Sequence, residues 1–395
     1  MHQVVVEKPY VFVPPYKGKF WPTVLRGMAR RRLKRKFGVV QVDCRGLENL
    51  DRSRKAGHGI LLAPNHCRPA DPFVIGEMAR QANILPHTMA SSHLFANGPL
   101  QSWFLSRGGV FSVYREGMDR QAIGAAMEIL EAADRPLVIF PEGVITRSND
   151  RLNALMDGTA FIARGAAKKR AQASPPGEVV IHPVALKYFF RGDIETAIGP
   201  ALDDIERRLS WQPQRGLSLA QRITKLGLAL LSLKEVEYLG AAQEGEIQTR
   251  IERLIDHLLV PLEKEWTGGK TEPAVVGRVK KLRSAVLPDM IEGKVAPEER
   301  ERRWRQLADM YLAQQLSCYP PDYLASAPTP ERMLETVERF EEDLTDECRI
   351  YRPMTVSVQV GEAIPVSPTR DRSAAEDPAM SALDKQLHDM IAGMK

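Results

Sequence analysis

Long apolar runs are missing from this 395-residue chain, in which no stretch reaches 18 apolar residues. A helix needs about 20 predominantly apolar residues to cross a bilayer, so the sequence predicts no transmembrane helix. The first residues, MHQVVVEKPYVFVPP, also lack the basic start and the long apolar segment of a secretory signal peptide. We therefore expect a protein of the cytoplasm.

Cysteine is scarce, and none of the spacings is that of a paired motif. The four cysteines are Cys44, Cys67, Cys318 and Cys348. We expect reduced thiols, with neither a disulfide framework nor a zinc site. Metal-ligand spacing is also absent among the histidines His58, His87, His93 and His182. The sequence thus predicts no metal, cofactor or prosthetic group.

Acidic residues are absent between Lys17 and Lys36, where nine basic residues occur. The formal net charge of the whole chain is +5. The remainder of the chain therefore carries a net charge of −4. The basic character is local, and it marks one segment as a candidate contact for an anionic partner.

Residues 22–37 have the pattern of a helix with one apolar stripe on an otherwise basic surface. The stripe recurs every four residues and consists of Trp21, Leu25, Ala29, Leu33 and Phe37. Such a helix can lie in a membrane interface with its cations near anionic head groups. It can also be a surface helix packed on its own domain, or an arm for nucleic acid. No zinc-finger spacing or RNA-binding aromatic motif supports nucleic acid, so we expect no nucleic-acid partner.

The middle of the chain alternates short apolar runs with helical stretches. Strands are predicted at 60–63, 137–140 and 179–186, with helices at 120–133 and 159–169 between them. This alternation indicates an α/β domain, with a mostly parallel sheet flanked by helices.

Beyond residue 201 the hydrophobic period becomes helical. Thr329, Pro330 and Glu331 form a helix start, with an N-cap, a first-turn proline and an acid at the positive end of the dipole. Residues 354–366 then return to a period of two, which predicts a strand rejoining the α/β part. We expect a basic amphipathic segment over 1–38 and an α/β domain over 39–200. These would be followed by an appended or inserted helical region over 201–350. The chain would end with strands over 351–368 and a polar tail with one short helix over 369–395.

Three short motifs carry candidate chemistry. In PNHCRPADP, His66 and Asp71 are separated by four residues and follow an apolar strand. Imidazole is the usual general base at neutral pH, and a carboxylate can orient it and stabilise its charged form. Cys67 is adjacent to His66 and on an extended segment would point to the opposite side, so we do not expect it to be a nucleophile.

The other two motifs also follow apolar runs. RGGVFSVYRE contains a glycine pair, a strand and then Arg115, which could bind a phosphate through two parallel hydrogen bonds. VIFPEGVITRSND places Glu142 directly after a buried strand, where a charged residue is unusual. Each motif alone is also typical of an ordinary turn.

Together, Asn-His-x4-Asp, Gly-x-Phe-x-x-x-Arg and Phe-Pro-Glu-Gly resemble the glycerolipid acyltransferase family. They look most like the 1-acylglycerol-3-phosphate (lysophosphatidate) acyltransferases, and IHPVALKY at 181–188 resembles a fourth block of that family. The resemblance implies that His66 is the general base and Asp71 its partner. It implies that Arg115, Glu142 and Gly143 bind the acceptor's glycerol phosphate, with Asn65 and Pro141 as supporting residues.

One motif departs from the family pattern. The family usually continues Phe-Pro-Glu-Gly-Thr-Arg, whereas Val144 and Ile145 occupy those two positions and Thr146 and Arg147 come two residues later. Arg147 is a further candidate for the acceptor phosphate. The helical region is longer than a minimal family member needs, and we assign it no catalytic motif.

The resemblance implies an O-acyltransferase of phospholipid biosynthesis. It would move a fatty acyl group from acyl-CoA or acyl-carrier protein to a lysophospholipid, and would bind peripherally to the cytoplasmic face of an anionic membrane through residues 17–36. Glycerol 3-phosphate or another lipid alcohol is an alternative acceptor. A non-catalytic lipid-binding protein and a thioesterase are alternatives of other kinds.

Overall fold

The protein is described by a computed structural model, which covers residues 9–370, 373 and 376–394. Residues 1–8 of the predicted basic segment, and 371–372, 374–375 and 395 of the predicted tail, lie outside the described residues. The chain divides into two compact units. The α/β unit comprises Tyr10–Tyr114, Met118–Arg191 and residues from Ile350 onward; the described part of the helical unit comprises Pro9, Arg115–Gly117 and Gly192–Arg349.

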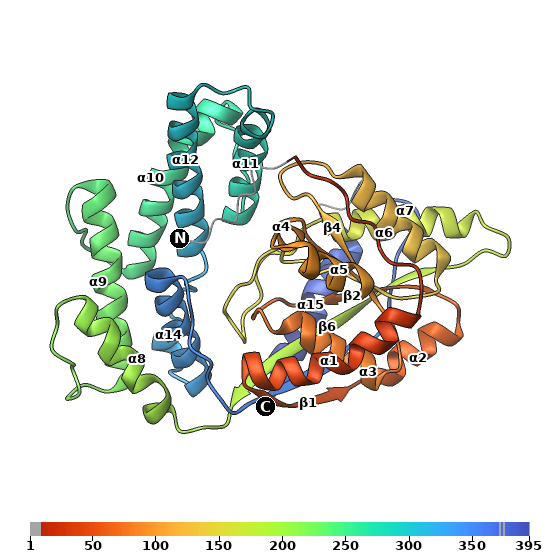
Figure 1. The fold of residues 1–395 in the computed structure, drawn as a ribbon, viewed down its shortest axis with the longest axis horizontal. Helices are drawn as coiled ribbons and strands as arrows, with labels where there is room; N and C mark the ends of the chain where they lie inside the picture. The colour runs from red at the N-terminus through yellow and green to blue at the C-terminus, as the bar shows by residue number, and fades with distance from the viewer. Residues whose placement is uncertain (1–8, 371–372, 374–375, 395) are drawn as a thin grey trace. The chain divides into compact units, whose positions relative to one another are not determined.

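The α/β unit is built on one sheet in the order β1-β7-β6-β2-β5-β3-β4, with β8 paired to β6 (Figure 1). Its strands are β1 (Val39–Arg45), β2 (Gly59–Pro64), β3 (His87–Ser91), β4 (Val110–Val113), β5 (Leu137–Val138), β6 (Val179–Phe190), β7 (Met354–Val360) and β8 (Ile364–Pro365). The five strands from β6 to β4 are parallel to one another, whereas β7 and β8 are antiparallel to β6. The expected α/β class with a mostly parallel sheet is confirmed.

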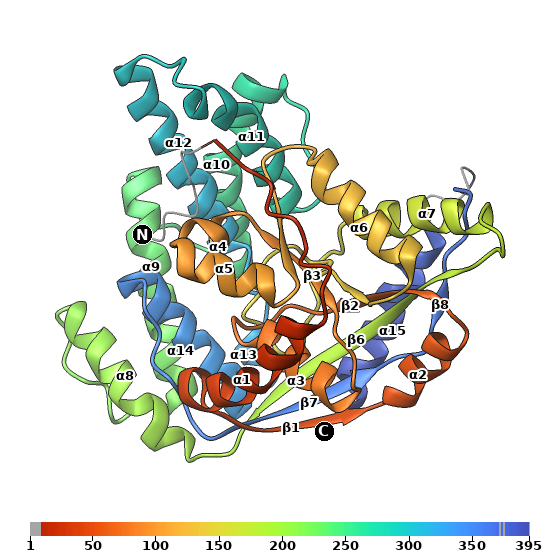
Figure 2. The same ribbon diagram turned by 45° about the vertical axis from the view of Figure 1, so that its right-hand side comes forward.

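Helices cover both faces of this sheet, as Figure 2 shows for α1 and α3 in front and α15 behind. The helices of the unit are α1 (Phe20–Phe37), α2 (Leu47–Lys55), α3 (Asp71–Gln81), α4 (His93–Ala96), α5 (Pro99–Arg107), α6 (Arg120–Ala132), α7 (Gly158–Ala171) and α15 (Pro378–Gly393). The apolar faces of α6, α7 and α15 share one core with β2, β5 and β6. Burial of these faces supplies the main driving force for folding the unit.

Two segments of this unit differ from the sequence-based expectations. The C-terminal segment is a 16-residue helix, α15, and not a short helix in a polar tail. Its residues Leu383 and Leu387 are fully buried against the sheet, so this segment belongs to the core. The expected strand over 354–366 is divided into β7 and β8, which pair with different parts of β6.

The apolar stripe predicted for α1 is used partly for packing. Leu33 is buried, the ring of Phe37 lies against that of Phe73 on α3, and Trp21 contacts Trp103 on α5 edge to face. Val24 and Met28, which lie beside this stripe in the sequence prediction, are exposed, as is Phe20. The helix therefore has one packed apolar face and a second apolar row toward solvent.

The helical unit consists of seven helices among the described residues. They are α8 (Ile194–Arg208), α9 (Leu219–Leu239), α10 (Ile247–Thr267), α11 (Val275–Ile291), α12 (Pro297–Leu316), α13 (Tyr323–Ser326) and α14 (Pro330–Thr345). Helix α14 begins at the predicted start, where the Thr329 side chain accepts a hydrogen bond from the backbone N–H of Arg332. Successive helices from α8 to α12 pack against one another, and α14 packs on α8 and α9.

A 28-residue repeat that the sequence-based reasoning missed underlies α9, α10 and α11. The segments RITKL, RIERL and RVKKL begin at Arg222, Arg250 and Arg278, in the first turn of each helix. The leucines that end these segments, at 226, 254 and 282, are fully buried. The array thus repeats one helix and its following loop.

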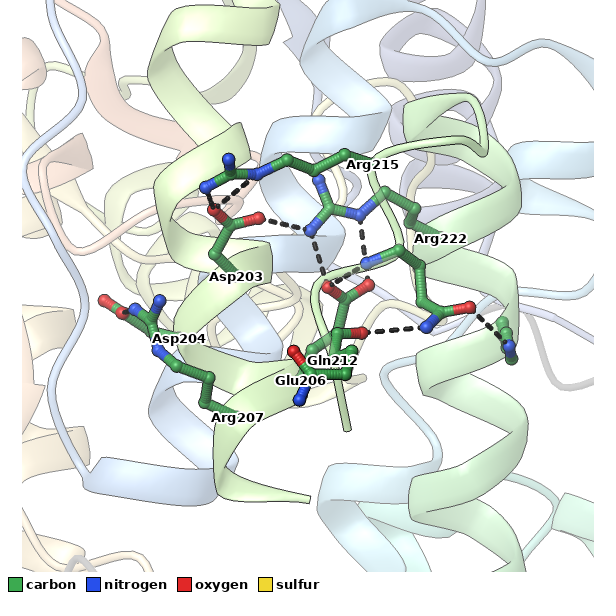
Figure 3. Close-up of polar contacts among 9 residues, drawn as sticks. Asp203, Asp204, Glu206, Arg207, Gln212, Arg215 and Arg222 are labelled. Atoms are coloured by element: carbon green, nitrogen blue, oxygen red, sulfur yellow. Dashed lines mark hydrogen bonds and ion pairs between the residues drawn. The ribbon is translucent and has the colours of Figure 1, made fainter. Parts of the chain in front are cut away.

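Each repeat arginine closes the corner with the preceding helix by binding a buried glutamate. Arg222 binds Glu206 through two hydrogen bonds of 3.0 and 2.7 Å (Figure 3). Arg250 binds Glu235 at 2.8 and 2.6 Å, and Arg278 binds Glu263 at 2.8 and 3.0 Å. Each of these three helix–helix connections therefore has its own bidentate ion pair, the geometry in which such pairs are strongest.

Candidate active site

The motif residues of the α/β unit meet at the carboxyl ends of two neighbouring strands. His66 lies two residues beyond β2, Asp71 is the first residue of α3, and Glu142 follows β5, which pairs with β2. In parallel sheets these strand ends form a common edge where α/β proteins build their sites. The predicted residues of the first and third motifs are therefore brought together.

His66 and Asp71 form a hydrogen-bonded pair. The distance from His66 Nδ1 to Asp71 Oδ2 is 2.8 Å, and the Asp71 side chain is completely buried. A carboxylate can only accept, so Nδ1 carries the proton and Nε2 has the lone pair. The His66 side chain is 15% exposed to solvent. The pair has the arrangement of a general base with an orienting carboxylate.

Two further donors fix the Asp71 carboxylate. The Tyr188 hydroxyl donates to Oδ1 at 2.6 Å, and the backbone N–H of Arg68 donates to Oδ2 at 2.8 Å. Burial and the negative charge of Asp71 raise the pKa of Tyr188 well above its usual value, so the phenol stays protonated as a donor. The Cys67 thiol is buried and lies 3.9 Å from Oδ1. Sequence reasoning missed Tyr188, which is 117 residues from Asp71.

Two asparagines join the site loops to β6 in the same manner. Asn65 accepts from the N–H of Leu186 at 2.7 Å and donates to its carbonyl at 3.0 Å. Asn149 makes the equivalent pair with the backbone of Tyr188, at 2.6 and 2.7 Å. Each side chain thus replaces a neighbouring strand at the end of the sheet. The supporting role of Asn65 in the reaction stays a prediction, and Asn149 was not foreseen.

Glu142 is buried and holds two loops through their backbones. Its carboxylate accepts from the N–H of His66 at 2.6 Å and from the N–H of Asn153 at 2.9 Å. Burial raises the pKa of Glu142 to about 7, against the opposing effect of these two donors. Both oxygens therefore already have protein partners that position His66. A direct contact with the acceptor stays a prediction.

The remaining residues of the third motif shape the turn after β5. Pro141 accepts from the backbone N–H of Met156 at 2.9 Å. Gly143 has a φ of 70°, a left-handed conformation that favours glycine. Arg147 is 9% exposed with a φ of 55°, which is uncommon for a residue with a side chain. Thr146 N donates to the carbonyl of His66 at 2.9 Å, so the turn is fixed to the loop that carries His66.

Arg115 is grouped with the helical unit. It is half-buried, and the neighbouring Glu116 binds Arg283 of α11 at 2.5 Å. The role of Arg115 in binding the acceptor phosphate stays a prediction. Within the described ranges no group of three or more His, Cys, Asp or Glu is placed to hold a metal ion.

The fold and the His66–Asp71 contact define an α/β domain with a hydrogen-bonded imidazole–carboxylate pair at the carboxyl edge of its sheet. Residues 41–187 match the family model described as Acyltransferase. No curated protein matches the chain. The match covers less than half of the chain, from β1 through most of β6, and it includes all of the predicted site residues. It supports an acyltransferase domain of the glycerolipid type over these residues.

Proposed function

We propose that the protein transfers a fatty acyl group from acyl-CoA or acyl-carrier protein to the hydroxyl group of a lysophospholipid, with 1-acylglycerol 3-phosphate as the preferred acceptor. The family match of residues 41–187 supports the general class of reaction. The acceptor and the donor rest on the resemblance of the individual motifs.

In the proposed reaction His66 Nε2 removes the proton from the acceptor hydroxyl as its oxygen attacks the thioester carbonyl. Asp71 stabilises the imidazolium through the Nδ1 hydrogen bond. The tetrahedral intermediate then expels the thiolate, and the imidazolium returns the proton to sulfur. The new ester bond forms as the thioester bond breaks, and no acyl-enzyme or metal is required.

The observation that carries the proposal is the His66–Asp71 pair, in which the carboxylate is fully buried and the histidine side chain is 15% exposed. Purified protein is to be mixed with acyl-CoA and a panel of lysolipids, and the products read by mass spectrometry. His66→Ala should lower turnover by about 10²–10⁴-fold. His388→Ala, which removes an exposed histidine of α15, is the matched control and should behave as wild type.

Each alternative function has its own outcome in this assay. A His66→Ala variant with wild-type turnover would refute the proposed base. Product from glycerol 3-phosphate alone would change the acceptor, and release of free fatty acid alone would indicate a thioesterase. Lipid binding without any product would favour a non-catalytic lipid-binding protein.

We also propose that the protein binds peripherally to an anionic membrane through α1 and α5. The part of the chain described by the structure contains no helix long and apolar enough to cross a membrane. Support comes from a basic helix that adjoins a group of exposed apolar side chains. These are Phe20, Val24 and Met28 of α1 with Leu100, Trp103 and Phe104 of α5.

This membrane proposal predicts a charge-dependent loss of binding. Each Lys or Arg near an anionic surface contributes about 1 kcal/mol, so changing Arg30, Arg31 and Arg32 together to Glu should release the protein from vesicles. Co-sedimentation at increasing salt is the measurement, since salt screens such charges. The same change at Arg52, Arg54 and Lys55 of α2 is the control. Equal release of both triple variants would indicate a nonspecific charge effect and contradict the proposal.

A further inference from the structure

The three copies of the 28-residue repeat differ from one another at two positions of the motif. The residues that build the corner, an arginine, a branched apolar residue and a leucine, recur in all three copies. The third residue of the motif is Thr224, Glu252 or Lys280, and the sixth is Gly227, Ile255 or Arg283. Only α11 carries a cation at both, one turn apart and therefore on one face of the helix.

Arg283 connects this face to the segment that contains Arg115. Its guanidinium binds the Glu116 carboxylate at 2.5 Å, and both side chains are largely buried. Glu116 is thereby held in an ion pair with Arg283. Lys281, on the neighbouring face, is likewise paired with Glu272 at 2.8 Å.

Arg115 and Lys280 are two neighbouring cations that take part in neither of these ion pairs. Among the residues that the structure describes, neither side chain has a carboxylate or a carbonyl as a hydrogen-bond partner. Burial lowers the pKa of Arg115, the negative charge of Glu116 opposes this shift, and the positive charge of Arg283 adds to it. Burial, and then the positive charge of Arg115, lower the pKa of Lys280 against the smaller opposing effect of Glu116. Glu116 acts on both cations but already binds Arg283, so three cations share one carboxylate, and such a cluster is suited to an anion.

The geometry points to an anion site in the helical unit in which Lys280, with Arg115, binds the phosphate of a phosphomonoester. The Glu116–Arg283 pair positions the segment that carries Arg115. A phosphomonoester fits because it carries nearly two negative charges at neutral pH and three acceptor oxygens. The planar guanidinium of Arg115 can bind two of these oxygens, and the ammonium of Lys280 can bind the third.

Assigning this phosphate to the acyl acceptor rests on the proposed function, whereas the anion site itself does not.

Calorimetric titration of the full chain tests the site with three probes: inorganic phosphate, glycerol 3-phosphate, and phosphatidylcholine vesicles containing 1-acylglycerol 3-phosphate. Lys280→Thr introduces the residue that the first repeat has at this position. One charge-assisted hydrogen bond at a partly exposed site should be reflected in about three- to tenfold weaker binding. Arg115→Gln should weaken binding about tenfold or more. Lys225→Thr, an exposed cation of the first repeat, is the control and should bind as wild type.

The outcomes separate the source of the phosphate and the two proposals. Weaker binding of the two small probes by Lys280→Thr supports a site for a free phosphomonoester, and weaker binding of the vesicles alone supports a lipid head group. Unchanged binding of all three probes, or no binding by wild type, overturns the site. If Lys280→Thr weakens phosphate binding while the wild type transfers no acyl group to any acceptor, the anion site stands and the proposed function fails.

Discussion

At the scale of single residues, the Tyr188 hydroxyl stabilises the negative charge of the Asp71 carboxylate by donating a hydrogen bond to it. Tyr188→Phe removes a donor from a fully buried oxygen, which costs about 1–3 kcal/mol. Turnover should fall about tenfold, because 1.4 kcal/mol corresponds to one factor of ten. A carboxylate that has lost a donor should hold the imidazolium more tightly, so the acid limb of kcat/KM should move to higher pH.

The pH profile distinguishes this positioning role from simple packing. Tyr10→Phe removes a different hydroxyl of the α/β unit, one that bonds Ser112, and should leave the profile in place. A Tyr188→Phe enzyme with lower turnover but an unmoved acid limb would show that Tyr188 only fills space.

Glu142 predicts a pH-dependent stability. Its pKa in the folded protein is raised from 4.5 to about 7, so the folded state binds a proton more tightly than the unfolded state. Proton binding by Glu142 therefore stabilises the folded state fully below about pH 4.5, and this contribution is lost as the pH rises through about 7. Relative to Glu142→Gln, the wild type should lose on the order of 3 kcal/mol across this range. Urea unfolding of both proteins at several pH values measures it, and parallel curves would contradict the assignment.

The candidate site was predictable from the sequence only where its residues are neighbours in a motif. His66 and Asp71 are five positions apart in a turn, and their types indicate one chemistry. Tyr188 and Asn149 could not be assigned, because their roles depend on how β6 and the loop after β5 come together in the sheet. Glu142 was noticed as a charge after a buried strand, but its binding of two backbone N–H groups depends on loop geometry.

At the scale of secondary-structure elements, the corner ion pairs should be essential to the helical unit. Glu235→Ala leaves Arg250 buried without its carboxylate, which should cost about 3–5 kcal/mol. Replacing both residues by Met should cost much less, since no charge is then left uncompensated. Lys234→Ala breaks an exposed pair with Glu237 on the same helix and should cost less than about 1 kcal/mol.

Tryptophan fluorescence during urea unfolding measures the stability of each variant, since Trp211, Trp266 and Trp304 lie in the helical unit. Equal costs for Glu235→Ala and Lys234→Ala would mean that the corner pairs contribute little.

Hydrophobic periodicity predicts some helices of this chain and does not reveal others. It located α1 and the start of α14, whose apolar spacing and N-cap are local signals. It did not reveal the repeat, because the recurring letters there include charged residues that serve the corners. It also underestimated α15, whose apolar residues alternate with polar ones and are buried only because β6 and β8 lie beneath them.

At the scale of the whole molecule, the helical region is placed between two paired strands. Phe190, the last residue of β6, is the antiparallel partner of Met354, the first of β7, and Arg191 N donates to Pro353 O at 2.9 Å. The change of hydrophobic period predicted such an arrangement. Which strand β7 would join could not be predicted, because apolar alternation does not specify a neighbour.

This placement predicts that the helical unit can be removed. Replacing residues 192–352, which are the helices and the first three residues after them, by a two-residue Asn-Gly turn, which favours hairpins, should leave a folded α/β unit. Circular dichroism and cooperative thermal unfolding measure this. Aggregation or loss of cooperativity would show that the sheet depends on the helices. A Pro-Pro linker of the same length, which does not favour the hairpin, is the control.

The β6–β7 pairing also has a consequence for chain entropy. With the helical region unfolded, bringing Arg191 to Pro353 would close a loop of roughly 160 residues, at a cost of about 4–5 kcal/mol. Within the folded helical unit, Arg349 near its end is bound to Asp204 near its start. Once these helices have formed, most of the loop has lost its freedom already, and the strands meet at a much smaller entropic cost. We therefore expect sheet closure to be slow until the helical unit has folded.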